Sequence, residues 1–289
     1  MQKDTPESRW FMERVLDRIC VFFQAPWPAT VAVFLVLAAL ITSNAKLDID
    51  LFHRLAVGRL VESTGGVVHK DPFAFSPRLD TWIDHEWLSG VVFHELVAMG
   101  GDRALITFDL LLVLLTVALV VQAQRCRFQG KGSDKIGVLW LLITLPLLCV
   151  VWVSVIRCRA FTFLFLSILS LVLVRWRNGK SLGLLSIPPL FLLWINLHGG
   201  VVAGFGIFGL AALAASIEDL RRSVPLWICL AVSGALTLVN PYGWDLWAYL
   251  GNAAVMDRPG IMEWESISPL TPGGIALIVL TAIVIMGGV

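Results

Sequence analysis

The feature that most constrains this fold is a series of long apolar runs without charge. The longest extends from Ser181 to Ile217 and contains no Asp, Glu, Lys or Arg. A helix needs only about 20 apolar residues to cross the hydrocarbon core of a bilayer, so this run is too long for one span. Asn196, His198 and the pair Gly199–Gly200 stand near its middle, which predicts two spans joined by a tight turn.

Other apolar runs predict one span each, and they cover residues 19–45, 104–124, 136–156, 160–174, 224–239 and 273–289. The chain is 57% hydrophobic and 15% charged, whereas soluble domains carry about 25% charged residues. The first run exceeds the roughly 7–15 residues of a signal-peptide core, so we expect a retained anchor. We therefore predict an all-α polytopic bundle of about eight transmembrane helices, forming a single integral membrane domain over residues 1–289.

The basic residues predict the orientation of the chain. With the N-terminus in the cytoplasm, thirteen of the 22 Lys and Arg residues fall on inside segments, the side that positive charges favour. We expect a multi-pass protein of the plasma or bacterial inner membrane. Its parts would be a cytoplasmic tail at 1–18, an extracytoplasmic loop at 46–103 and the remaining spans within 104–289. The net charge of +1 implies no nucleic-acid partner.

The loop at 46–103 concentrates acids and histidines. Asp50, His53 and Arg54 are spaced i, i+3 and i+4, so they share one helical face, and Arg54 would supply positive charge beside Asp50. Leu51, Phe52 and Leu55 form the apolar side. This pattern predicts an amphipathic surface helix near 49–63, and the run that begins at Asp84, His85 and Glu86 and stops at Gly100–Gly101 predicts a second near 84–99.

The other unusual polar residues fall on the same expected side of the membrane. They are Arg157, Arg159, Asn196, His198, Asn240, Tyr242 and Glu265. This segregation predicts an outward-facing site at the membrane surface. Simpler readings stay open for each residue: Asp48, Asp50 or Asp84 as helix caps, and the arginines as helix-end anchors.

Five strings carry a resemblance: DIDLFHRLAVGR at 48–59, KDPF at 70–73, WIDHEWL at 82–88, INLHGG at 195–200 and NPYGW at 240–244. Together they resemble a group of bacterial multi-pass proteins associated with the GT-C class of membrane glycosyltransferases. Such enzymes use polyprenyl-phosphate-linked sugars, so the resemblance implies transfer of a sugar from that lipid to an extracytoplasmic acceptor. Asp48 or Asp50 would match the catalytic carboxylate of the first outer loop.

Two features depart from the class. Ile49 separates Asp48 from Asp50, whereas many members have adjacent acids, and members usually continue beyond an eighth span. A shortened or inactive relative therefore stays an alternative.

The residues themselves suit this chemistry. A carboxylate can remove the proton of an acceptor hydroxyl, and arginine matches two phosphate oxygens. We therefore expect Asp50, supported by Asp48, as the catalytic base. A divalent cation, Mg²⁺ or Mn²⁺, held by Asp48 and Asp50 is a further expectation. The candidate substrate-binding residues are His53, Arg54, Asp84, His85, Glu86, Arg157, Arg159, His198, Asn240, Tyr242 and Glu265.

Two other classes of function remain. A non-catalytic scaffold, or a subunit of a polysaccharide or cell-envelope assembly, would use the acids only as caps and the tryptophans only as interfacial anchors. A transporter would place charges along a path near the midplane. Since the apolar runs are almost free of charge and Asp109 is the main exception, this reading ranks last.

The orientation can be tested by thiol labelling in a background without the five native cysteines. We expect His69→Cys to react with an impermeant maleimide added outside intact cells, because the loop at 46–103 should be extracytoplasmic. Asp134→Cys should react only after permeabilisation. Labelling of position 69 from the cytoplasmic side alone would overturn the orientation.

Overall fold

The computed structural model describes residues 49–76, 81–128 and 156–256, with residues 268, 270, 271 and 274. Its helices are α3 (Ile49–Thr64), α4 (Trp87–Phe128), α6 (Arg159–Arg177), η1 (Leu182–Ser186), α7 (Ile187–Leu197), α8 (Val201–Glu218), α9 (Leu220–Leu236) and α10 (Trp244–Val255). No strand occurs in these ranges, so the described part confirms the all-α prediction. The chain divides into two compact units, residues 1–246 and 247–289.

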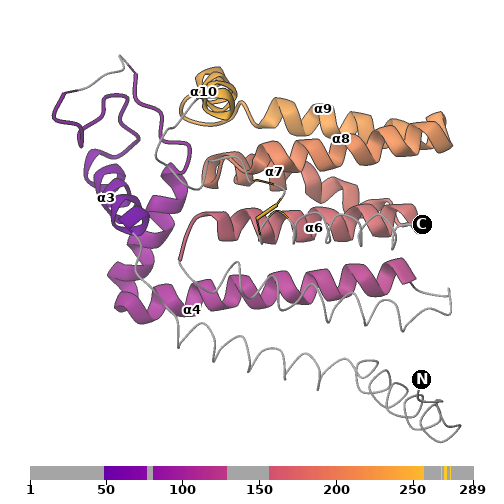
Figure 1. Ribbon diagram of the computed structural model, residues 1–289, viewed down its shortest axis with the longest axis horizontal. Helices are drawn as coiled ribbons and strands as arrows, with labels where there is room; N and C mark the ends of the chain where they lie inside the picture. The colour runs from indigo at the N-terminus through magenta and orange to yellow at the C-terminus, as the bar shows by residue number, and fades with distance from the viewer. Residues whose placement is uncertain are drawn as a thin grey trace, which may run out of the picture. The chain divides into compact units, whose positions relative to one another are not determined.

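The helices support a membrane protein. Three of them are long and apolar enough to cross a bilayer, Trp87–Arg127, Arg159–Arg177 and Val201–Glu218, and a shorter apolar segment covers Leu182–Leu197. In Figure 1 the long part of α4 runs alongside α6, and α8 runs alongside α9. The runs at 19–45 and 136–155 lie outside the described residues, as does nearly all of 273–289, so the number of about eight spans stays a prediction.

The long charge-free run divides as predicted. Helix α7 ends at Leu197, and α8 begins at Val201. Between them His198 is extended, with φ −162° and ψ 137°. A Cβ atom at Gly200 would stand 2.3 Å from Thr162 Oγ1 of α6, so the turn can pass this close to α6 only because position 200 lacks a side chain.

Helix α4 consists of two helical segments joined by a kink. Gly100 and Gly101 leave helical geometry, and Gly101 has a φ of 62°, a conformation that glycine adopts at little cost. The predicted helix near 84–99 therefore ends where expected. It begins at Trp87, and in the turn before it Asp84 Oδ1 accepts the Glu86 N–H at 2.9 Å.

Helix α3 crosses the first segment of α4 at two glycines. A Cβ atom at Gly58 would lie 2.2 Å from the carbonyl oxygen of Gly90, so the two backbones are in direct contact there. The face of α3 that this crossing buries carries Leu51, Arg54 and Val57. Phe52 of the predicted apolar side is 57% exposed, and the face buried within the protein includes the charged Arg54; contact of the apolar side with the membrane surface stays a prediction.

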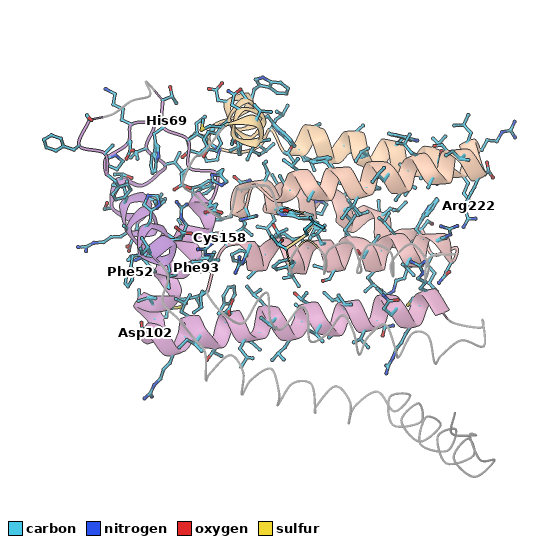
Figure 2. All side chains as sticks on the ribbon, in the orientation of Figure 1. Phe52, His69, Phe93, Asp102, Cys158 and Arg222 are labelled. Carbon is cyan, nitrogen blue, oxygen red and sulfur yellow. The ribbon has the colours of Figure 1, made fainter. Side chains whose placement is uncertain are left out.

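Among the described residues, the basic side chains expected on the inside lie near one end of the helices. Asn178 Nδ2 donates to the Cys126 carbonyl at 2.6 Å, and Arg222 Nη2 donates to the Arg177 carbonyl at 2.7 Å. Arg177 also pairs with Glu218 at 2.6 Å. Figure 2 shows Arg222 at this end and His69 toward the opposite end. The ends of α4, α6 and α8 thus meet in one basic cluster, as the alternation of spans predicted.

The glycine crossing makes a stability prediction. Gly58→Ala should lower the free energy of unfolding by about 1–3 kcal/mol, because backbone atoms that cannot move aside oppose the new methyl group. Gly206→Ala is the matched control: it lies in α8, and a Cβ atom there meets nothing within 4 Å. Thermal unfolding in detergent measures both. Equal melting temperatures for the two variants would contradict the close crossing.

Candidate functional site

A buried ion pair lies where α3 meets the start of α4. Arg54 Nη1 lies 2.5 Å from Asp84 Oδ1, and the two residues are 8% and 3% exposed. Although burial opposes the charge, Asp84 and Glu86 raise the pKa of Arg54. A buried charge is tolerated when it is paired and hydrogen-bonded. Arg54 therefore holds the segment before α4 against α3.

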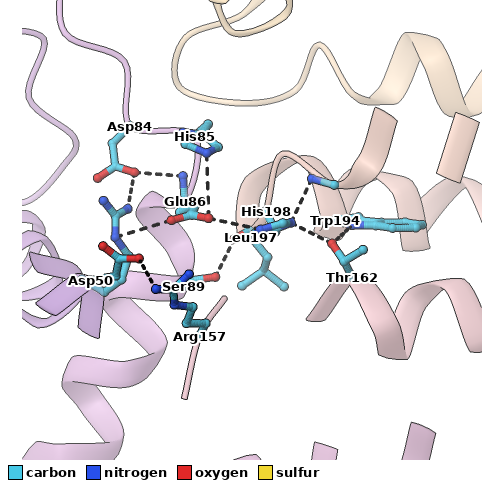
Figure 3. Close-up of polar contacts among 12 residues, drawn as sticks. Asp50, Asp84, His85, Glu86, Ser89, Arg157, Thr162, Trp194, Leu197 and His198 are labelled. Carbon is cyan, nitrogen blue, oxygen red and sulfur yellow. Dashed lines mark hydrogen bonds and ion pairs between the residues drawn. The ribbon is translucent and has the colours of Figure 1, made fainter. Parts of the chain in front are cut away.

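Glu86 has looser partners on both carboxylate oxygens. Oε2 lies 3.6 Å from Arg54 Nε, and Oε1 lies 3.3 Å from His198 Nε2 and 3.8 Å from His85 Nε2. Figure 3 shows this carboxylate with His85 and His198 as neighbours. Through these contacts Glu86 joins the loop at 46–103 to the α7–α8 turn. Its side chain is 19% exposed, so the carboxylate remains accessible.

His198 is oriented by donors on its other ring nitrogen. The Gly200 N–H donates to Nδ1 at 2.9 Å, and Thr162 Oγ1 lies 2.8 Å from the same atom. Trp194 Nε1 donates to Thr162 Oγ1 at 3.0 Å, which leaves the hydroxyl proton for His198. Because a backbone N–H can only donate, Nδ1 must be unprotonated. The remaining proton lies on Nε2 and faces Glu86. Burial lowers the pKa of His198 in spite of Glu86.

Asp50 occupies a different environment. Its Oδ2 lies 3.3 Å from Arg157 Nη2, and its side chain is 65% exposed. The expectation that Arg54 would supply the charge beside Asp50 was wrong, because Arg54 points instead to Asp84 and Glu86. Arg157, which precedes the first turn of α6, is the positively charged partner of Asp50. The first turn of α3 and the residues just before α6 therefore meet through one ion pair.

Other predicted residues are placed as follows. His53 Nδ1 lies 2.7 Å from Arg54 Nη2, and burial, followed by Arg54, lowers the pKa of His53. Asn240 closes a turn, since its side chain donates to two carbonyls and accepts the Tyr242 N–H at 2.8 Å. Tyr242 is buried, and its ring meets His69 edge-on at 5.3 Å. Arg159 begins α6 and is half-buried.

Asp48 and Glu265 lie outside the described residues, so their roles stay predictions. Within the ranges that the structure does describe, no group of three or more His, Cys, Asp or Glu side chains converges as metal ligands would. At Asp84 and Asp50 the positive partners are the guanidinium groups of Arg54 and Arg157. The expected Mg²⁺ or Mn²⁺ site at Asp48 and Asp50 remains a prediction.

Sequence reasoning missed several residues that build the site. Thr162 and Trp194 lie within apolar runs and look like ordinary packing residues, yet they fix the His198 ring. Ser89 Oγ donates to the Leu197 carbonyl at 2.5 Å and ties α4 to the α7–α8 turn. No spacing in the sequence predicts these contacts, because they join segments that only the tertiary fold brings together.

Comparison of the chain with protein-family models, with curated proteins and with solved structures finds no match. The geometry above is therefore the basis for any functional proposal.

The two lowered histidine pKa values predict how stability depends on pH. In the unfolded chain His53 and His198 have the ordinary histidine pKa of 6.5, and in the folded chain both pKa values are lower. The unfolded state then binds more protons in acid, so stability should fall as the pH drops from about 7.5 to about 5. Because glutamine does not titrate, His198→Gln should flatten this decline, and His53→Gln with His198→Gln should flatten it further. Thermal melts across this range measure the slope, and an unchanged slope in both variants would contradict the assignment of neutral rings.

Proposed function

We propose that this protein transfers a sugar from a polyprenyl-phosphate donor to an extracytoplasmic acceptor. The observation that carries the proposal is the exposed Asp50 carboxylate facing Arg157 at 3.3 Å, where α3 and α6 begin. The Glu86–His198 pair belongs to the same end of the helices (Figure 3). A base, a cation suited to phosphate and further polar groups thus stand together at the end of apolar helices.

Each group has a part in this reaction. Asp50 accepts the proton of the acceptor hydroxyl, and the acceptor oxygen bonds to the anomeric carbon of the sugar. The bond from that carbon to the phosphate oxygen breaks, and its electron pair leaves with the lipid phosphate. Arg157 offers a planar fork of N–H groups for that phosphate, and Arg159 at the start of α6 is the second candidate. The lipid tail would lie along the apolar helices.

A purely structural scaffold explains part of the site. Asp84 accepts the Glu86 N–H in the turn before α4 and pairs with buried Arg54, so its carboxylate already has a structural role. In the first turn of α3, Asp50 also interacts favourably with the helix dipole. Exposure distinguishes it from Asp84, because an exposed carboxylate can meet a substrate and a buried one cannot. The two readings are separable by experiment.

The first test is the identity of the bound lipid. We expect mass spectrometry of the purified protein to detect a polyprenyl-phosphate-linked sugar. Transfer is then measured with that lipid. Asp50→Asn should lower the transfer rate by about 10²-fold or more, as loss of a general base does, while the melting temperature falls only slightly, because an exposed ion pair and a helix-dipole contact each contribute about 1 kcal/mol or less.

Asp71→Asn is the matched control in the same loop. Its Oδ1 accepts the N–H groups of Phe73 and Ala74, a capping role that asparagine fills about as well, so this variant should transfer normally. Recovery of ordinary phospholipids only, or full transfer by Asp50→Asn, would return the protein to the scaffold class.

A further inference from the structure

We propose that Glu86 is a second carboxylate that contacts the ligand, binding hydroxyl groups of the transferred sugar, and that His198 is the residue that positions it. This inference rests on the proposed function and deepens it, because it assigns the sugar and the phosphate to different side chains of one site.

The acids of this loop differ in which of their oxygens a ligand can reach. Asp84 Oδ1 accepts hydrogen bonds from Arg54 at 2.5 Å and from the Glu86 N–H at 2.9 Å, and its Oδ2 has no hydrogen-bond partner among the described residues but is buried. Glu86 has charged or ring partners at 3.3, 3.6 and 3.8 Å, and none of these contacts has hydrogen-bond geometry among the described residues. A partly exposed carboxylate of this kind keeps acceptor capacity for a ligand.

The position of Glu86 is nevertheless fixed from several directions. Its backbone N–H is bound to Asp84, which is itself held by Arg54 of α3. Its side chain lies between Arg54 on one oxygen and His198 on the other. A group that is fixed in place but incompletely hydrogen-bonded is what a binding site requires, because little ordering remains to be done when the ligand arrives.

His198 can present only its Nε2–H to Glu86. Gly200 and Thr162 occupy Nδ1, and Trp194, which is fully buried, fixes the Thr162 hydroxyl. The chain of hydrogen bonds ends in the apolar core at Trp194, so it orients the ring and offers no route for a proton to leave. His198 therefore acts through Glu86, as a positioning residue.

The chemistry of the ligand follows from the charges around Glu86. An anionic phosphate would be repelled by this carboxylate and is better matched to Arg157. A further cation would be repelled by Arg54 and by the imidazole N–H of His198, which already face the carboxylate. A neutral hydroxyl donates to a carboxylate without either penalty, and hydrogen bonds to charged groups are the stronger kind. A sugar supplies several such hydroxyls.

Two lipid probes separate sugar recognition from phosphate recognition. Undecaprenyl phosphate carries the phosphate alone, and undecaprenyl phosphate bearing glucose or mannose adds the hydroxyls. Dissociation constants are measured by native mass spectrometry in detergent. Wild type should bind one of the sugar-bearing lipids more tightly than the bare carrier. Glu86→Gln should weaken binding of that lipid by about 10–100-fold and should not weaken binding of the bare carrier.

Glu62→Gln is the matched control. Glu62 also pairs with a histidine, His94, at 2.9 Å between α3 and α4, but in an exposed position, so its loss should leave both affinities unchanged. Equal melting temperatures for the two variants exclude misfolding. If Glu86→Gln does not fold, Thr162→Val takes its place, because it removes only the hydroxyl that orients His198.

The positioning role has its own readout. Thr162→Val should raise KM for the sugar-bearing lipid with little change in kcat, and Thr162→Ser should restore KM because it restores the hydroxyl. Equal weakening of both lipids by Glu86→Gln, no preference of wild type for a sugar-bearing lipid, or an unchanged KM in Thr162→Val would overturn this inference and leave the proposed function standing. Failure of wild type to bind any of the lipids would overturn both.

Discussion

The buried pair of Arg54 and Asp84 is the interaction on which the rest of the site depends. It forms because Gly58 and Gly90 let α3 and α4 touch backbone to backbone, which leaves Arg54 on the buried face of α3. Removing one partner of such a pair costs about 3–5 kcal/mol, since an uncompensated charge stays behind. Through Asp84 the same pair fixes the turn that precedes α4, and Glu86 lies in that turn.

A second constraint is the control of histidine charge. His53 Nδ1 faces the Arg54 guanidinium, and His198 Nδ1 faces the Gly200 N–H. Each donor opposes a proton on that nitrogen, and burial acts in the same direction. Both rings therefore stay neutral near pH 7, and the charges of the site are those of its arginines and carboxylates.

The sequence predicts a good part of the fold. Apolar run length locates α6 and α8, glycines locate the α7–α8 turn and the kink in α4, and helical spacing locates α3. The sequence also predicts which polar residues gather at one end. It does not separate Asp84 from Glu86, which are two residues apart and chemically alike. Their roles diverge because Arg54 reaches Asp84 closely and Glu86 only loosely, and that difference depends on how two helices cross.

The separate environments of Asp50, Asp84 and Glu86 are more than a purely structural role requires. A scaffold needs only one negative partner to balance the buried charge of Arg54, and Asp84 supplies it at 2.5 Å. Glu86 adds a second negative charge beside the same arginine, and Thr162, Trp194 and Gly200 serve to orient the histidine that faces it. Holding an additional carboxylate beside apolar helices costs desolvation, and stability alone does not explain why the fold keeps it accessible. The proposed contact with hydroxyl groups of a ligand would account for it.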